Sequence, residues 1–214
     1  MKNKTMLWTS LAGLLPLVYG GLLYNELPAR VATHFGLNGQ ANEYSGKLTA
    51  ILLLPLLLLA ADWIVYLSTK YGKRTRKQSP KFSNVMLWMF PVMANVLQIT
   101  MFVEALGYDA PIIEIVSMLM GMIFIVLGNY LLKLTPNSMM GVRIPSTMKN
   151  PENWAKTNRL AGVMFVLSGI GLLIAGLTGF VWTLAPMIGF TISFVLIAIV
   201  PLVYSLTLKN TSKD

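Results

Sequence analysis

The amino-acid sequence predicts an all-α fold: an integral membrane bundle of six transmembrane helices, forming a single membrane domain over residues 1–214. Charged residues make up only 12% of the chain, whereas ordinary soluble domains carry about 25%. The mean hydropathy is +0.64. The charges are clustered, and long uncharged stretches separate the clusters. A chain of this kind cannot hide its apolar surface from water by folding alone, so we expect lipid around it.

Six apolar segments account for the bundle, and each is 19 to 26 residues long. At a rise of about 1.5 Å per residue, each helix can cross a hydrocarbon core of about 30 Å. A soluble bundle of buried helices is the alternative, but such helices carry a polar stripe, and residues 51–61 are all apolar. The predicted spans are residues 6–24, 48–69, 84–105, 111–132, 160–181 and 183–208.

The first span resembles a signal peptide, because two lysines precede an apolar run. The run continues to Tyr24, however, and residues 25–28 lack the small-x-small pattern of a cleavage site. We therefore predict that this segment is a retained transmembrane helix.

The lysines and arginines predict the orientation. Only Arg30 and Lys47 lie in the predicted outer loop, residues 25–47. The other fifteen lie on the opposite side, which the positive-inside rule assigns to the cytoplasm. Both termini and the loops 70–83 and 133–159 are then cytoplasmic, and the net charge of +9 reflects topology and contact with anionic lipid rather than nucleic-acid binding. The fifteen are Lys2, Lys4, Lys70, Lys73, Arg74, Arg76, Lys77, Lys81, Lys133, Arg143, Lys149, Lys156, Arg159, Lys209 and Lys213.

Residues inside the spans bear on how the helices pack. Small residues at every fourth position allow close helix approach, either within the bundle or at the seam of a homodimer. This stripe consists of Gly171, Ala175 and Gly179. Prolines inside the spans predict kinks, which transmembrane helices tolerate because neighbouring groups hydrogen-bond the freed carbonyls. They are Pro16, Pro55, Pro91, Pro186 and Pro201.

The outer loop is long enough to have structure of its own. Asn38 and Gly39 form a dipeptide typical of a two-residue hairpin turn, so we predict a short β-hairpin. His34 is the one histidine of the chain, and it is either a hydrogen-bonding loop residue or a contact to a ligand or an incoming peptide. The predicted contact residues on this side are His34, Asn38, Gly39 and Lys47.

The loop 133–159 combines prolines and a glycine with apolar side chains next to Arg143, which indicates a loop folded back onto the bundle or a docking surface. Asn150, Pro151 and Glu152 predict a helix start that continues into the next span. The predicted contact residues on this side are Asn129, Asn137, Arg143, Trp154 and Arg159. For the two arginines, topology and headgroup contact is the alternative.

Few polar residues lie within the predicted membrane: Asp62, Asn95, Gln98 and Asn129, with Glu104 and Glu114 near the outer ends of their spans. A charged aspartate at the centre of a span costs roughly 2.5 to 3.5 kcal/mol on insertion. Asp62 therefore marks a functional site or forms an ion pair, for which Arg143 is the candidate partner. A polar path through these residues would make the protein a small-solute or ion transporter, which is the alternative function.

The sequence offers no catalytic set, so we predict that the protein is not an enzyme. Cysteine is absent and histidine occurs once, which excludes disulfides, thiolate sites and multi-histidine metal sites. No metalloprotease or nucleophile-elbow motif is present. We expect no metal and no cofactor.

The two loops resemble those of a known family, the SdpI immunity proteins of Gram-positive bacteria. The outer motif is Leu27-Pro28, Thr33-His34-Phe35, Asn38-Gly39 and Lys47, with Asn42 where an aspartate is common. The more specific second motif is Gly128-Asn129-Tyr130, Pro136-Asn137, Gly141-Val142-Arg143-Ile144-Pro145, Trp154, Asn158-Arg159 and Gly162.

The resemblance implies a six-helix, multi-pass protein of the bacterial cell membrane. A characterised member protects a toxin-producing cell against its own secreted peptide toxin, and it also holds a small cytoplasmic repressor at the membrane. The partners that the resemblance implies are therefore a secreted peptide toxin on the outer face and a cytoplasmic repressor. A general role in envelope-stress defence is the alternative within this family.

Overall fold

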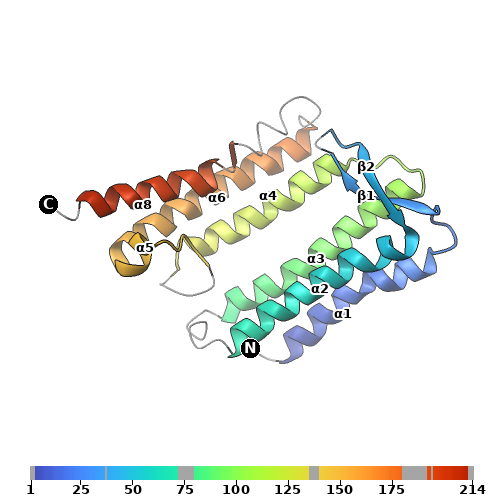
Figure 1. The fold of residues 1–214 in the computed structure, drawn as a ribbon, viewed down its shortest axis with the longest axis horizontal. Coiled ribbons are helices and arrows are strands. Elements are labelled where there is room, and N and C mark those ends of the chain that lie inside the picture. Colours follow the sequence, from blue (N-terminus) through green and yellow to red (C-terminus); the bar gives the residue numbers. More distant parts are fainter. Residues whose placement is uncertain are drawn as a thin grey trace. The chain divides into compact units, whose positions relative to one another are not determined.

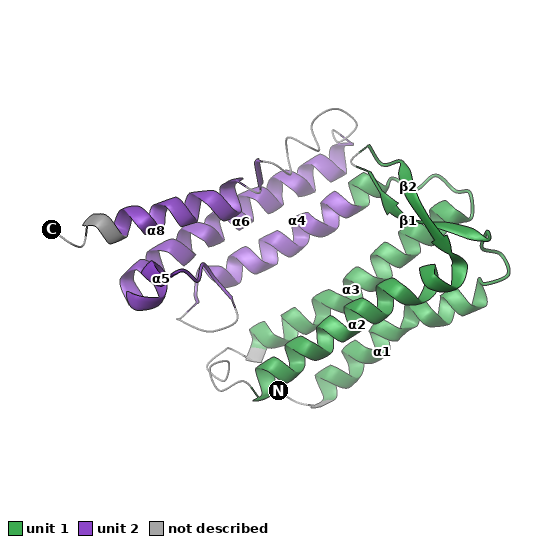
Figure 2. Ribbon diagram, in the orientation of Figure 1, with its two compact units in different colours: residues 1–115 green, residues 116–214 purple. Residues whose placement is uncertain are grey.

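The computed structural model describes residues 3–36, 38–71, 80–134, 140–179, 192–193 and 195–211. It divides into two compact units, residues 1–115 and residues 116–214 (Figure 2). Each unit has its own packing, and each is described by itself below.

The N-terminal unit is a three-helix bundle with a hairpin at one end (Figure 1). Helices α1 (Asn3–Leu22), α2 (Lys47–Tyr71) and α3 (Pro80–Ala105) each contact the other two. The hairpin consists of β1 (Arg30–Phe35) and β2 (Ala41–Gly46), and it lies between α1 and α2 in the chain. These bounds agree with the predicted spans to within a few residues. Residues 72–79, most of the predicted loop 70–83, lie outside the described residues.

The predicted hairpin is confirmed, but hydrogen bonds of Gly36 close its turn, so the turn extends beyond the predicted pair Asn38-Gly39. The Gly36 amide donates to the Gln40 carbonyl at 2.8 Å, and the Gly39 amide donates to the Gly36 carbonyl at 2.9 Å. Gly39 has a φ of 76°, a left-handed conformation that is common in hairpin turns. Glycine adopts this conformation at no steric cost, which is why the Asn38-Gly39 dipeptide predicted the position of the turn correctly. The two-residue length that we predicted was wrong.

Prolines lie inside α1, α2 and α3, as the sequence predicts. At one of them, a side chain of a neighbouring helix replaces the backbone hydrogen bond that the proline removes. Pro16 has no amide hydrogen, so the carbonyl of Ala12, four residues earlier, loses its helical donor. The Asn95 carboxamide of α3 donates to that carbonyl at 2.9 Å. Gln98 of α3 likewise donates to the Ala50 carbonyl of α2 at 2.9 Å. Two of the predicted intramembrane polar residues thus join helices.

The C-terminal unit contains most of α4 (Ile112–Leu131), the short α5 (Pro145–Lys149), α6 (Pro151–Thr178), the π-helical stretch η2 (Val195–Ile199) and α8 (Val200–Thr211). The predicted helix start at Asn150, Pro151 and Glu152 is confirmed, and α6 continues from there into the apolar span that was predicted from residue 160. Asn150 caps the helix by accepting from the amides of Glu152, at 2.9 Å, and Asn153, at 3.2 Å, as its sequence indicates. The predicted loop 133–159 therefore contains α5 and the first turns of α6.

Glycines bring α4 and α6 into close contact. A Cβ atom added at Gly128 would lie 2.7 Å from the Gly162 carbonyl oxygen, and one added at Gly121 would lie 2.7 Å from the Gly169 carbonyl oxygen. Gly171, from the predicted small-residue stripe, has nothing within 4 Å. Close approach in this unit thus uses glycines at a different spacing, on another face of α6.

The protein is a multi-pass membrane protein. Five helices are long and apolar enough to cross a bilayer. They expose large aliphatic side chains, and Leu53, Leu57 and Ile64 of α2 each keep more than half of their surface accessible. The sixth predicted span, 183–208, falls partly outside the described residues, and its described part, Val195–Leu208, is shorter than a full crossing. Six spans therefore stay a prediction.

Candidate functional site

The hairpin is fixed to the helical bundle by one face of β1. Val31 is fully buried and Leu27 nearly so, and both pack with side chains of α2 and α3 in one apolar cluster. Lys47, at the start of α2, donates to the carbonyls of Tyr24, at 3.0 Å, and Leu27, at 3.3 Å. Its ammonium also lies 4.7 Å from the centre of the Tyr24 ring. Lys47, a predicted contact residue, therefore ties the two ends of the loop together.

His34 is exposed on this fixed hairpin. Its Nδ1 lies 2.6 Å from the carboxamide oxygen of Asn42 on β2. Because that oxygen can only accept, the contact requires the proton on Nδ1, and the neutral ring presents the lone pair of Nε2 to a partner. His34 also pairs across the strands with Glu43. A shallow surface recess next to this pair is lined by Arg30, Asn42, Glu43 and Tyr44.

Asn38 and Gly39 form the turn. The Asn38 carboxamide accepts from the Gln40 amide at 3.2 Å and donates to the Gln40 side chain at 3.1 Å, so Asn38 organises the turn while remaining exposed. Gly39 packs against Ile113, since a Cβ atom there would lie 3.2 Å from the Ile113 side chain. The structure thus places His34, Asn38 and Gly39 on the hairpin, whereas Lys47 lies at the start of α2, at the end of the hairpin opposite the turn.

In the C-terminal unit, the chain before α5 folds back onto α6. The Asn158 carboxamide accepts from the Val142 amide at 2.8 Å and donates to the Trp154 carbonyl at 3.0 Å. The Trp154 indole, which is fully buried, donates to the Leu134 carbonyl at 3.1 Å. Gly141 has a φ of 111°, and a Cβ there would collide with Asn158. Trp154 therefore supports the loop from the interior of the unit, and its indole ring is not accessible to a partner.

The remaining predicted contacts in this unit are exposed. Arg143, Arg159 and Asn129 all have accessible side chains, and Asn137 lies outside the described residues. Arg143 projects from the segment that Gly141 and Asn158 hold in place. The loop backbone is thus hydrogen-bonded to α6 next to an exposed arginine side chain.

A buried polar cluster that the sequence analysis missed connects α5, α6 and α8. The Asn153 carboxamide donates to the Ser205 carbonyl at 2.9 Å and accepts from the Ser205 hydroxyl at 2.8 Å. Ser146 of α5 lies 2.8 Å from the Ser205 hydroxyl, and Thr157 donates to Asn153 at 2.9 Å. Asn153 and Thr157 are one helical turn apart, and this spacing could have predicted that their side chains form a hydrogen bond. Their partner Ser205 on α8 lies 52 residues from Asn153 in the sequence, so the rest of the cluster could not be predicted in this way.

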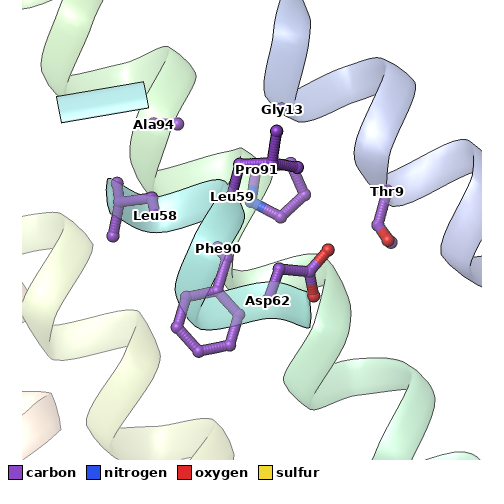
Figure 3. A pocket seen from close by; sticks show the side chains of 8 residues that line it. All are labelled: Thr9, Gly13, Leu58, Leu59, Asp62, Phe90, Pro91 and Ala94. Carbon is purple, nitrogen blue, oxygen red and sulfur yellow. The ribbon is translucent and has the colours of Figure 1, made fainter. Parts of the chain in front are cut away.

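Asp62, the remaining predicted polar residue, lies in a small pocket between α1, α2 and α3 (Figure 3). It is 1% exposed, and the pocket lining is apolar except for Asp62 itself and Thr9. All of the lining residues belong to the N-terminal unit. The proposed ion pair with Arg143, which belongs to the other unit, stays a prediction.

The described residues thus form a multi-pass membrane protein with a tethered polar hairpin and a folded-back basic loop, and no group of three metal-binding side chains gathers among them. The model of the SdpI/YfhL protein family matches residues 133–205, which include the folded-back loop and the Asn153 cluster. A domain of unknown function, DUF1648, matches residues 11–59, which include the hairpin. No solved structure matches.

Among characterised proteins, the immunity protein SdpI of Bacillus subtilis (strain 168) is 30% identical over 151 residues. The match covers 69% of this chain and 70% of the relative. The protein therefore belongs to the SdpI family, as its loop motifs indicated.

Proposed function

We propose that this protein is a membrane immunity and signalling protein that protects its cell against a secreted antimicrobial peptide. In this proposal the hairpin faces the cell exterior and meets the peptide, and the folded-back loop faces the cytoplasm, where it docks a small repressor. The observation that carries the proposal is the similarity to an immunity protein over two thirds of both chains.

The hairpin suits a peptide contact because it is both anchored and chemically accessible. Lys47 and the buried face of β1 hold the hairpin on the bundle. Because the hairpin is already ordered, it loses little conformational entropy when a partner binds. On the accessible face, His34 Nε2, the Arg30 guanidinium and the Glu43 carboxylate offer an acceptor, a cation and an anion. A peptide that carries mixed charge can use all three.

The orientation rests on the distribution of basic residues. Fifteen of the seventeen lysines and arginines fall on the side of the termini and the folded-back loop. That asymmetry supports cytoplasmic termini and an external hairpin.

The proposed repressor contact is the exposed surface around α5. Arg143, Lys149 and the Met148 side chain, which keeps 44% of its surface accessible, lie on one short segment. The Asn158 contact fixes the backbone before it, and the Asn153 cluster fixes α5 to α6 and α8. A basic and apolar patch on a rigid support suits a partner with an acidic, partly apolar face.

Deletion and complementation test the immunity role. Cells that lack the gene should become sensitive to the cognate secreted peptide, and the full chain should restore growth. His34→Ala should lose most of the protection. Asn42→Ala should weaken it, while Asn42→Asp, which keeps the acceptor for His34, should retain it. Tyr108→Ala, at an exposed position outside the hairpin, is the control. A deletion strain as resistant as the parent would refute the proposal.

The signalling role has a separate readout. Where a small helix-turn-helix repressor is encoded beside the gene, a fluorescent fusion of that repressor should move to the membrane when the peptide is added. Arg143→Glu should abolish this movement and leave peptide resistance intact. A repressor that stays in the cytosol with the wild-type protein would remove the signalling half of the proposal and leave the immunity half standing.

A further inference from the structure

The short helix α5 has one buried face and one exposed face. Ser146 and Thr147 are buried, whereas Met148 and Lys149 are exposed and belong to the surface proposed above to dock a repressor. With only five residues, α5 is too short to be stable on its own. The contacts of its buried face therefore decide where the exposed surface lies.

The two buried side chains of α5 have different partners. The Thr147 hydroxyl accepts from the Ile144 amide at 3.1 Å and donates to the Val142 carbonyl at 2.7 Å, so it binds the segment that leads into α5. The Ser146 hydroxyl instead lies 2.8 Å from the Ser205 hydroxyl of α8. Among the described residues, Ser146 thus forms the side-chain hydrogen bond that joins α5 to another helix.

The direction of this hydrogen bond follows from the other contacts of Ser205. The Asn153 carboxamide nitrogen donates to the Ser205 carbonyl at 2.9 Å, and its oxygen lies 2.8 Å from the Ser205 hydroxyl. Because a carboxamide oxygen can only accept, the single hydroxyl proton of Ser205 points to Asn153. The proton between the two serines is then that of Ser146. Ser146 donates to Ser205, and Ser205 donates to Asn153.

Asn153, the end of this chain of hydrogen bonds, is itself fixed on α6. Its carboxamide oxygen also accepts from the Thr157 hydroxyl at 2.9 Å, and its amide donates to the Asn150 cap at 3.2 Å. Asn153, Thr157 and Ser205 are all buried. Since a buried polar group that loses its partner is costly, this arrangement of donors and acceptors is strongly favoured.

Ser205 uses different atoms for its two tasks. Helix α8 runs alongside α6 (Figure 1), and the bond from Asn153 to the Ser205 carbonyl joins these two helices through the backbone of α8. That bond does not depend on the side chain at position 205. The hydroxyl oxygen of Ser205, by contrast, is the atom that receives the bond from α5.

We propose that Ser205 is a positioning residue for the docking surface, and that α8 thereby controls this surface. While α8 lies on α6, its hydroxyl holds Ser146, and Met148 and Lys149 keep fixed positions. When Ser205 moves away, α5 loses this bond and the surface loses its fixed geometry. The identity of the partner rests on the proposed function, whereas the link between α8 and α5 is a property of this chain alone.

Hydrogen exchange of the full-length protein in lipid nanodiscs, with no partner added, tests the link. The Met148 amide donates to the Ile144 carbonyl at 3.0 Å and therefore reports the opening of α5. Ser205→Ala removes one hydrogen bond to α5, so exchange at this amide should be about two- to tenfold faster. An unchanged rate would overturn the proposal.

Two controls separate this effect from a general loss of structure. The Trp154 amide of α6, which donates to the Asn150 carbonyl at 2.9 Å, should exchange at the wild-type rate in Ser205→Ala. Ser168→Ala removes another buried serine hydroxyl of the same unit, one with no hydrogen-bond partner among the described residues. This variant should match the wild type at Met148. Equal acceleration at Met148 and Trp154 would show that the unit as a whole had loosened and would count against a positioning role.

A double variant tests whether the two serines act through one bond. Ser146→Ala breaks the same contact from the side of α5, so it should accelerate exchange at Met148 as Ser205→Ala does. The Ser146→Ala, Ser205→Ala double variant should then exchange no faster than the faster single variant. Effects that multiply would mean that the two hydroxyls act independently, which contradicts the chain of hydrogen bonds.

Recruitment of the repressor tests the control of docking. In cells that encode such a repressor, Ser205→Ala should reduce its movement to the membrane several-fold and leave peptide resistance unchanged. Faster exchange at Met148 with undiminished recruitment would overturn control of docking by α8. A wild-type protein that recruits no repressor would refute the signalling role and, with it, the docking part of the proposal, whereas the exchange rates decide the link between α8 and α5 by themselves.

Discussion

The contact between α4 and α6 can be tested by two substitutions on one helix. A Cβ atom at Gly162 would lie 2.8 Å from the Gly128 carbonyl oxygen and 3.0 Å from the Leu132 side chain. A Cβ atom at Gly171 would meet nothing within 4 Å. Because both glycines are inside α6, replacement by alanine changes the intrinsic helix preference equally, and the two variants differ only in what the methyl group meets.

The expected magnitudes have opposite signs. Forcing a methyl group into a packed contact costs about 1–3 kcal/mol, because the helices must separate. Replacing glycine by alanine in a helix interior gains about 0.5–1 kcal/mol. We therefore expect Gly162→Ala to lower the free energy of unfolding by up to about 2 kcal/mol and Gly171→Ala to raise it slightly, with a difference of about 1–3 kcal/mol between the two.

Denaturant unfolding of the purified protein in mixed micelles measures both variants under the same conditions. Equal effects on the free energy of unfolding would refute the close approach of α4 and α6. If Gly171→Ala were the destabilising variant, the small-residue stripe would instead be a seam between two copies, and a change in the oligomeric state on size-exclusion chromatography would accompany it.

Three further substitutions test single contacts. Asn158→Leu removes the acceptor of the Val142 amide, so hydrogen exchange at that amide should be roughly tenfold faster; an unchanged rate would mean that the loop holds without this bond. Lys47→Met should speed proteolytic cleavage of the loop before it, whose two carbonyls lose their donor; equal cleavage would contradict the tether. Asn95→Leu leaves the Ala12 carbonyl without a donor and should lower the free energy of unfolding by about 0.6–1.7 kcal/mol; no change would show that this bond adds nothing.

Features decided by neighbouring residues in the chain were predictable. The spans follow from runs of apolar residues, and the structure places helices over five of them. The start of α6 at Pro151 follows from the Asn150 cap, as the sequence predicts, and the apolar span begins further along the same helix. Its end at Thr178 follows from Gly179, which adopts the left-handed conformation that terminates helices. In each case the deciding interaction lies within about one helical turn.

The roles of several candidate residues were not predictable, because their partners are distant in sequence. Lys47 is predicted as a contact residue, yet it binds carbonyls more than 19 residues earlier. Trp154 is predicted as a contact, yet it is fully buried beneath the loop that it supports. His34 contacts Asn42, which lies on the neighbouring strand, so the contact depends on how the two strands pair.

The sequence by itself determined that this chain lies in a membrane, that a hairpin lies between its first two helices, and that it has the loop motifs of the SdpI family. Those properties depend on composition, on local backbone preference and on residue identity, all of which are read along the chain. Only the tertiary structure decided which glycines let α4 and α6 touch, which polar side chains join helices, and that Asp62 is enclosed in a largely apolar pocket of the N-terminal unit. These outcomes depend on which faces of separate helices meet, and that is fixed by packing many residues at once.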